Sequence, residues 1–241
     1  MVGYSVRGVI NRVTGRYDFE GHYKSFLAVS NPTSHDNAEF ANAAVDARLR
    51  NWPGSYAIDL LPLMVSDYTD VTVVDVGGGA VTGLAQIVSS VISTGRVHYI
   101  LVETPHMCAA VERLKAKIDI EFTISEAMPS SVRQPSIVNA ASVLQYIDNW
   151  QGALEDFARL KPEAIIISNT PMSDVPTYVR CQTNGRDRRI PAWCFHREDL
   201  TREMARLGYQ RRYYIEHDHK LRHKDAPGPS VQASMIFYSV G

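Results

Sequence analysis

The stretch Val71-Thr72-Val73-Val74-Asp75-Val76-Gly77-Gly78-Gly79 decides the fold. Its first six residues are mostly β-branched, which is typical of a strand buried on both faces of a parallel sheet. The three glycines let the backbone turn sharply and let a ligand approach closely, at the start of a helix whose dipole favours negative charge. A flexible turn is the alternative interpretation when the glycines are taken alone.

Strands and helices alternate after this stretch. Further strands are expected at residues 98–102, 122–125, 137–141 and 164–168, and helices at 82–92, 106–117 and 150–160. Strands that alternate with helices of about ten residues form βαβ units, which build a parallel sheet. The chain ends with a helix at 197–207 and two strands, 209–216 and 232–240, that are joined by a loop and are therefore expected to be antiparallel.

The segment before residue 67 is helical and aromatic in character rather than sheet-like. Ser34 can cap one helix, and a second short helix is expected at 56–65. The sequence thus predicts an α/β fold with a doubly wound, mostly parallel, Rossmann-like sheet of seven strands and an antiparallel C-terminal hairpin. The expected division is a helical N-terminal lid, residues 1–66, and a ligand-binding domain, residues 67–241.

Composition limits the possible functions. The 241 residues are 45% hydrophobic and 21% charged, which is ordinary for a globular enzyme and excludes a disordered chain. The net charge of −1 argues against a protein that coats nucleic acid or a membrane surface. The sequence shows no signal pattern at its start, no apolar run of the ~20 residues that a membrane helix needs, and no metal-ligand spacing among its three cysteines. We therefore expect a cytoplasmic protein with no membrane partner.

Two acidic residues strengthen the interpretation of the glycine turn as a binding site. Asp75 lies two residues before Gly77, where an unpaired buried carboxylate would be unfavourable. Glu103 ends the next strand, 24 residues after Gly79 and close to the spacing of about 20 at which a carboxylate binds ribose hydroxyls. Together they predict an adenosine-containing ligand across the carboxyl ends of two adjacent parallel strands.

The glycine pattern distinguishes between two such ligands. A dinucleotide site requires Gly-x-Gly-x-x-Gly, whereas here Thr82 stands at the position of the last glycine. Asp75 would also be unfavourable close to a pyrophosphate. S-adenosylmethionine (SAM) has no phosphate and carries a cationic amino group, so an acidic residue beside the glycines favours SAM.

Residues 73–79 resemble the first motif of the class I SAM-dependent methyltransferases, and Val102-Glu103 resembles their ribose-binding acid. More narrowly, the chain resembles a bacterial family of methyltransferases found with surface-polysaccharide or natural-product genes. The matching segments span most of the chain and are 21–26, 102–105, 142–147, 169–172, 179–182, 190–193 and 207–209.

The chain departs from the family pattern at three places. Val81 replaces the usual third glycine of the first motif, although Gly83 follows. Residues 134–136 lack the acid that is common at the start of the next strand, 137–141. Residues 139–142 do not match the acidic, Pro-Pro-aromatic signature of adenine amino-group methylation, so no nucleic-acid partner is expected.

The resemblance implies which residues bind the cofactor. They are Asp75, Gly77, Gly78 and Gly79 for the methionine end of SAM, Glu103 for the ribose with Thr104 beside it, Ser125 and Glu126 for the adenine, and Ala141 and Ser142 at the methyl-transfer mouth. Gln145 and Tyr146 would line the same mouth, and core packing is the alternative explanation for Tyr146. Tyr146 and His196 are the candidate catalytic residues, with His196 as a general base or, alternatively, as a residue at a helix entry.

The acceptor side is defined less sharply. Tyr178, Arg180 and Gln182 follow the strand 164–168, where many class I enzymes insert acceptor-binding segments, and an ordinary loop is the alternative. Tyr23 and Phe26 are candidates for a lid that excludes water, and a hydrophobic staple explains them nearly as well.

No metal site is expected. His217, His219 and His223 alternate as residues on one face of a strand do, but Lys220, Arg222 and Lys224 would crowd a divalent cation with positive charge.

Charge is distributed unevenly along the chain. Residues 180–224 contain 12 Lys and Arg against 6 Asp and Glu, which leaves 13 against 20 for the rest. A solvated Arg-rich helix and loop would explain most of these arginines. Because the segment covers the expected acceptor side, the excess predicts an acceptor that carries a carboxylate or a phosphate.

The leading functional hypothesis is a methyltransferase that moves the SAM methyl group to an oxygen, hydroxyl or carboxylate, of a small-molecule or sugar-linked acceptor and releases S-adenosylhomocysteine (SAH). One alternative is a NAD-dependent oxidoreductase or epimerase on a Rossmann fold, although the sequence lacks the third fingerprint glycine. Another is a SAM-fold protein that binds without catalysis. The acceptor and the possible homodimer stay open at this stage.

Overall fold

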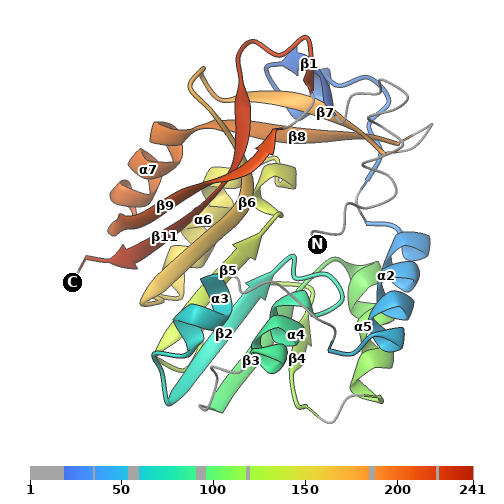
Figure 1. The fold of residues 1–241 in the computed structure, drawn as a ribbon, viewed down its shortest axis with the longest axis vertical. Coiled ribbons are helices and arrows are strands. Elements are labelled where there is room, and N and C mark those ends of the chain that lie inside the picture. The colour runs from blue at the N-terminus through green and yellow to red at the C-terminus, as the bar shows by residue number, and fades with distance from the viewer. Residues whose placement is uncertain are drawn as a thin grey trace.

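The computed structural model describes residues 19–34, 36–53, 60–90, 96–117, 120–184, 188–220 and 223–240. Seven of its strands run side by side in the order β4 (Thr123–Ser125), β3 (Arg96–Val102), β2 (Asp70–Val76), β5 (Ser136–Ala141), β6 (Ala164–Ser173), β11 (Ser230–Ser239) and β9 (Tyr209–Lys220). The strands from β2 to β6 pair in parallel, while β11 is antiparallel to both β6 and β9. This confirms the predicted α/β sheet and its C-terminal hairpin (Figure 1).

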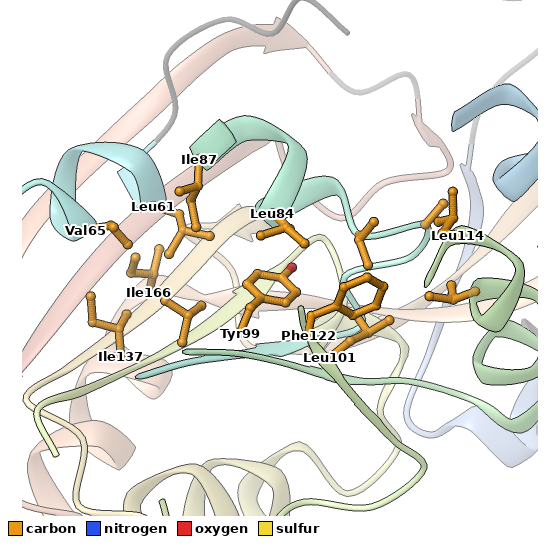
Figure 2. Packing of buried hydrophobic residues seen from close by; sticks show 14 of the residues in the cluster. Leu61, Val65, Leu84, Ile87, Tyr99, Leu101, Leu114, Phe122, Ile137 and Ile166 are labelled. Atoms are coloured by element: carbon orange, nitrogen blue, oxygen red, sulfur yellow. The ribbon is translucent and has the colours of Figure 1, made fainter. Parts of the chain in front are cut away.

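Helices cover both faces of this sheet. One face packs against α2 (Ala38–Arg50), α3 (Leu60–Val65), α4 (Thr82–Ser89) and α5 (Pro105–Lys115), and the other against α6 (Trp150–Arg159) and α7 (Arg197–Arg206). Figure 2 shows the hydrophobic core between the sheet and the first group of helices. In this core Tyr99 lies beneath Leu84 of α4, with its hydroxyl directed towards that helix. None of the described helices is long and apolar enough to span a membrane.

Four further strands correct the predicted count of seven, because the described sheet has 11 strands in all. They are β1 (Phe19–Tyr23), β7 (Tyr178–Asn184), β8 (Arg188–His196) and β10 (His223–Lys224). They form a smaller sheet, which joins the main one where Met172 and Ser173 of β6 pair with Phe195 and His196 of β8. The segment after the strand 164–168 is therefore a β-hairpin rather than a loop, and the N-terminal segment contributes a strand as well as helices.

The N-terminal helices differ in detail from the prediction. Helix α2 begins at Ala38 because the Asn37 side chain accepts a hydrogen bond from the Phe40 amide, whereas Ser34 accepts one from the Asp36 amide outside the helix. The helix expected at 56–65 is described from Leu60 onward, and residues 56–59 lie outside the described residues. The helix expected at 82–92 ends at Ser89, and residues 91 and 92 lie outside the described residues.

Candidate functional site

The topology places the candidate site at the carboxyl ends of β2 and β5. The chain leaves β2 towards β3 and β4 on one side and returns to β5 and β6 on the other. Ligands of open α/β sheets bind at such a switch point, beyond the carboxyl ends of the strands. The glycine turn follows β2 there, and the neighbouring strand β5 ends at Ala141, which Ser142 follows.

The glycine turn adopts backbone angles that favour glycine. Gly77 and Gly79 have φ angles of +66° and +58°, and the Gly77 amide donates to the Val102 carbonyl at 2.9 Å. A β-carbon added at Gly77 would overlap the Val143 side chain, whereas one added at Gly79 would meet nothing within 4 Å. The backbone at Gly79 therefore faces open space in which a ligand can approach it.

Val81 explains the departure from the expected third glycine. It precedes α4 with φ 50° and ψ 45°, in the left-handed region that β-branched residues rarely occupy. Its side chain is fully buried in the core. The turn thus keeps the backbone shape that a glycine would give and adds apolar packing at the cost of local strain.

Asp75 lies beneath the turn and is 1% exposed. The Tyr99 hydroxyl donates to its Oδ2 atom, and the Asn139 side-chain amide donates to Oδ1 at 2.7 Å. A β-carbon at Gly83 would lie 2.6 Å from Oδ2, so this glycine lets α4 pack directly on the carboxylate. Burial raises the pKa of Asp75 to about 6 despite the two donors. Asp75 therefore supports the turn from below, and its predicted contact with a cofactor stays a prediction.

Glu103 connects the two strand ends. One carboxylate oxygen accepts the Gly79 amide at 2.9 Å, and the other accepts the Thr104 amide at 2.8 Å. Both sequence-predicted halves of the site, the glycine turn and the acid, thus meet. Because both bonds go to backbone amides at the surface of the turn, the carboxylate oxygens lie where hydroxyl groups of a ligand could also donate to them.

The other predicted cofactor residues surround this pair. Ser125 ends β4 opposite Val102, its carbonyl accepts the Glu103 amide at 3.0 Å, and Glu126 follows it at the surface. Thr104 is the residue that precedes α5. Ser142 has a φ angle of 57°, and its amide donates to the Ser168 carbonyl at 2.8 Å. The structure brings all the predicted cofactor residues to one edge of the sheet.

A short 3-10 helix, η2 (Leu144–Tyr146), carries the candidate mouth residues. It follows Val143, which packs against Gly77, so it lies next to the glycine turn. The Tyr146 hydroxyl donates to the Gln182 side-chain oxygen of β7 at 2.7 Å. Gln145 is 4% exposed, and its side-chain oxygen has no hydrogen-bond partner among the described residues. The structure thus joins Tyr146 and Gln182, which the sequence predicts in separate segments.

Arg180 and Tyr178 lie on the same face of β7 as Gln182, because alternate residues of a strand share a face. Both are buried, Arg180 at 0% exposure and Tyr178 at 2%. The Arg180 guanidinium stacks 3.4 Å from the centre of the Phe19 ring. Burial raises the pKa of the Tyr146 hydroxyl, and the Gln145 side chain and the Arg180 charge oppose only part of that increase. The positive charge of Arg180 therefore acts on the mouth from inside the protein.

Comparison with solved structures assigns this geometry to a fold. A 1,6-didemethyltoxoflavin-N1-methyltransferase from Burkholderia thailandensis, solved with its substrate and SAH, matches 88% of this chain and 94% of its own at a TM-score of 0.53 and 14% identity. A SAM-dependent methyltransferase from Methanosarcina mazei matches 72% of this chain and 94% of its own, with a TM-score of 0.52 and 11% identity. The magnesium protoporphyrin IX methyltransferase of Synechocystis PCC 6803, solved with SAH, covers 84% and 98%, with a TM-score of 0.50 and 11% identity.

The fold is that of the SAM-dependent methyltransferases. No protein-family model matches the sequence, and no curated protein matches it. At these identities the likeness shows the fold alone. In this chain, the glycine turn, Glu103 and η2 lie together at one edge of the sheet.

Tyr23 and Phe26, the two predicted lid residues, lie on the face of the smaller sheet opposite to the face that carries Arg180. Tyr23 pairs with Val179 in the register of β1 and β7, and Phe26 stacks on Trp193 with ring centres 5.4 Å apart. Both belong to a small apolar cluster around Val179. These contacts place both side chains in an apolar cluster, and both the lid role and the staple alternative stay predictions.

His196 is separated from the mouth. It ends β8 and precedes α7, its amide donates to the Thr177 hydroxyl at 2.9 Å, and its ring lies 3.8 Å from Asp199. Ala192, which pairs with Arg180, is four residues away, or about 13 Å along an extended strand. These contacts explain His196 as a residue at the helix entry, and its role as general base stays a prediction.

Ion pairs among the described residues account for half of the 12 positive charges in residues 180–224. Six of its arginines pair with acids: Arg188, Arg189, Arg197, Arg202, Arg206 and Arg211. Four of the partner acids lie outside the segment: Glu20, Glu39, Glu155 and Asp174. The local excess is thus largely compensated in space, and among the described arginines of this segment the buried Arg180 is the one whose charge opposes the raised pKa of Tyr146.

His217 and His223, the described histidine side chains of the C-terminal strands, have separate partners. His217 bonds the Ser234 hydroxyl at 2.7 Å, and His223 bonds the Gly21 carbonyl and the Tyr178 hydroxyl at 2.8 and 3.3 Å. Among the described residues no cluster of three or more potential metal ligands is found.

Several residues of the site were not predicted from the sequence. Tyr99 and Asn139 hold Asp75, and Phe19 and His223 surround Arg180 and Tyr178. The polar residues Tyr99 and Asn139 inside otherwise apolar strands were a usable signal, because a buried polar group requires a partner. Phe19 and His223 gave no such signal, since they meet β7 only through pairing between distant segments.

Proposed function

We propose that the protein is a SAM-dependent methyltransferase that acts on a small-molecule acceptor. The observation that carries this proposal is the bond between the Gly79 amide and the Glu103 carboxylate, at the switch point of a methyltransferase fold. Neighbours of the same fold that were solved with SAH support SAM as the cofactor. Residues 67–241 would form the cofactor-binding domain, and residues 1–66 its cap.

The residues present fit this cofactor. The open space at Gly79 admits a ligand to the backbone, and the Glu103 oxygens can accept two ribose hydroxyls in place of the amides they now bind. Ser125 and Glu126 flank Glu103 on the side of β4, where the adenine would lie. When bound here, SAM would supply an electrophilic methyl group for transfer to an acceptor oxygen, with the electron pair of the broken carbon–sulfur bond left on the sulfur of SAH.

The acceptor that the mouth favours is an anion, in particular a carboxylate. The raised pKa of Tyr146 keeps its hydroxyl protonated at neutral pH, so it donates its hydrogen bond to Gln182 and does not serve as a proton acceptor. A carboxylate acceptor is already ionised and needs no base, and the buried charge of Arg180 stabilises it. The enzyme would then contribute mainly by orienting the acceptor oxygen, which supplies on the order of 7–11 kcal/mol.

Calorimetric titration with SAH tests the cofactor assignment. We expect the wild-type protein to bind SAH and Glu103→Gln to bind it at least about tenfold more weakly, because an amide accepts only one of the two hydroxyls well. Glu112→Gln removes an exposed carboxylate from α5 and is the matched control with unchanged affinity. Absence of SAH binding, together with quenching on titration with NADH, would instead support the oxidoreductase alternative.

Transfer of a labelled methyl group to a panel of acceptors tests the reaction. We expect label in small carboxylic acids and phosphorylated compounds in preference to their neutral amides or alcohols. SAH binding without transfer to any member of the panel would support a non-catalytic SAM-binding protein. Transfer to neutral or cationic acceptors alone would contradict the anionic acceptor.

A further inference from the structure

We propose that the segment 36–50 positions the cofactor site by holding the glycine turn and the Glu103 turn at a fixed separation, with Arg48 and Asp36 as its positioning residues. This segment, called here the α2 strap, contains α2 and the two residues before it. The inference rests on the proposed function, because it concerns the same SAM site.

Arg48 connects the strap to the glycine turn. Its guanidinium donates to the Ala80 carbonyl at 3.0 Å and to the Thr82 hydroxyl at 3.1 Å, and it also reaches the Pro53 carbonyl at 3.3 Å. Ala80 directly follows Gly79, and Thr82 begins α4. No side-chain cap is present at the start of α4, where Val81 stands. Arg48 therefore holds both ends of a strained turn from a different part of the chain.

Asp36 connects the strap to the turn after Glu103. Its carboxylate accepts the His106 amide at 3.2 Å and lies 3.0 Å from the His106 ring nitrogen. Thr104 makes no side-chain cap of its own for α5. Asp36 thus caps α5 from outside, at the helix end where the dipole favours a negative charge.

The two contacts close a ring of hydrogen bonds. The ring runs from α2 through Arg48 to Ala80, along the turn to Gly79, across to Glu103, along the chain to the His106 amide, and through Asp36 back to α2. If ribose hydroxyls take the place of the Gly79 amide on Glu103, this side-chain link between the two turns is lost, and the backbone bond from Gly77 to Val102 at the strand ends remains. The strap would then keep the two turns at a fixed separation while the Glu103 carboxylate binds the ligand.

The body of the strap is attached independently. Ala41 and Val45 are buried in the core cluster that includes Val111 of α5, and Arg113 of α5 bonds Asn42 and pairs with Asp46. Arg113 lies two turns of helix away from the start of α5. Arg113→Met is therefore a control that weakens the docking of α2 without touching either turn.

Hydrogen–deuterium exchange on the ligand-free protein tests the strap without any cofactor. We expect Arg48→Met to raise amide exchange about tenfold at residues 80–83, and Asp36→Ala to do so at 104–108. Asp36→Asn keeps an oxygen for the His106 amide and is expected to restore most of the protection. Arg113→Met is expected to raise exchange in α2 alone. Unchanged exchange at both turns in Arg48→Met and Asp36→Ala would overturn the proposal.

SAH titration then tests the consequence for the site. Arg48→Met and Asp36→Ala should each weaken SAH binding by about tenfold, and Arg113→Met should leave it unchanged. In turnover the KM for SAM should rise while kcat is retained. Equal losses of SAH affinity in all three variants would mean that the strap contributes only to the overall stability of the fold, which would contradict the proposal. If the wild type binds no SAH, the proposed function fails, and the exchange measurement still decides whether the strap holds the turns.

Discussion

The parallel sheet from β2 to β6 and the smaller sheet of β1, β7, β8 and β10 meet at the proposed methyl-transfer mouth, but they are stabilised in different ways. The parallel sheet is buried between two extensive aliphatic cores. The smaller sheet has an apolar cluster around Val29, Val179 and Cys181 on one face and a buried polar group around Arg180 on the other. The parallel sheet is therefore suited to supporting the cofactor rigidly, and the smaller sheet offers a polar surface suited to selecting the acceptor.

The largest expected effect contrasts the two cores directly. Leu101 and Val179 are both fully buried, but Leu101 belongs to the large core and Val179 to the small cluster. Leu101→Ala should lower the free energy of unfolding by about 4 kcal/mol, and Val179→Ala by about 1–2 kcal/mol. Urea denaturation measures both values.

The comparison also predicts a functional difference. At temperatures where both variants are folded, Val179→Ala should change the KM for the acceptor and leave SAH affinity intact. An equal loss of stability in the two variants, or a loss of SAH binding in Val179→Ala, would show that the two sheets form one energetic unit.

The same contrast explains what the sequence could predict. The strands of the parallel sheet were recognisable because residues 71–76 and 164–168 are apolar on both faces, and the glycine turn and Glu103 follow from their positions at strand ends. The smaller sheet was missed because the apolar–polar alternation of β7, Val179-Arg180-Cys181-Gln182, is only four residues long. Its pairing with β1 depends on contacts between residues about 160 apart, which no local pattern encodes.

Asp75 provides the next prediction, within the parallel sheet. Its pKa of about 6 in the folded protein exceeds the ordinary value of 3.8, so burial penalises its charged form. The penalty is absent below pH ~4, where the carboxyl is protonated in both states, and complete above pH ~6, where it is ionised in both. Asp75→Asn removes it, so the stability of the variant relative to the wild type should rise by about 3 kcal/mol between pH 4 and pH 7.

Tyr99→Phe is the matched comparison for this measurement. It removes the hydroxyl that donates to Asp75 and leaves the charge, so it should destabilise the protein more at pH 7 than at pH 4. Denaturation curves at both pH values give the two differences. A relative stability of Asp75→Asn that does not change with pH would contradict the buried, partly destabilising carboxylate.

Tyr146 supplies the smallest effect and tests the acceptor side alone. Tyr146→Phe removes the bond to Gln182, and we expect the KM of a carboxylate acceptor to rise about tenfold with unchanged SAH affinity. Tyr68→Phe is the matched control, because it removes a comparable hydrogen bond, 2.9 Å to Glu163. Tyr68 lies between α3 and β2, so neither the KM of the acceptor nor the SAH affinity should change. Because burial keeps the Tyr146 hydroxyl protonated, the pH profile of kcat should be the same in wild type and variant. A fall in kcat with a shifted pH profile would instead identify Tyr146 as a proton-transfer group, and the smaller sheet would then contribute to the chemical step as well as to acceptor selection.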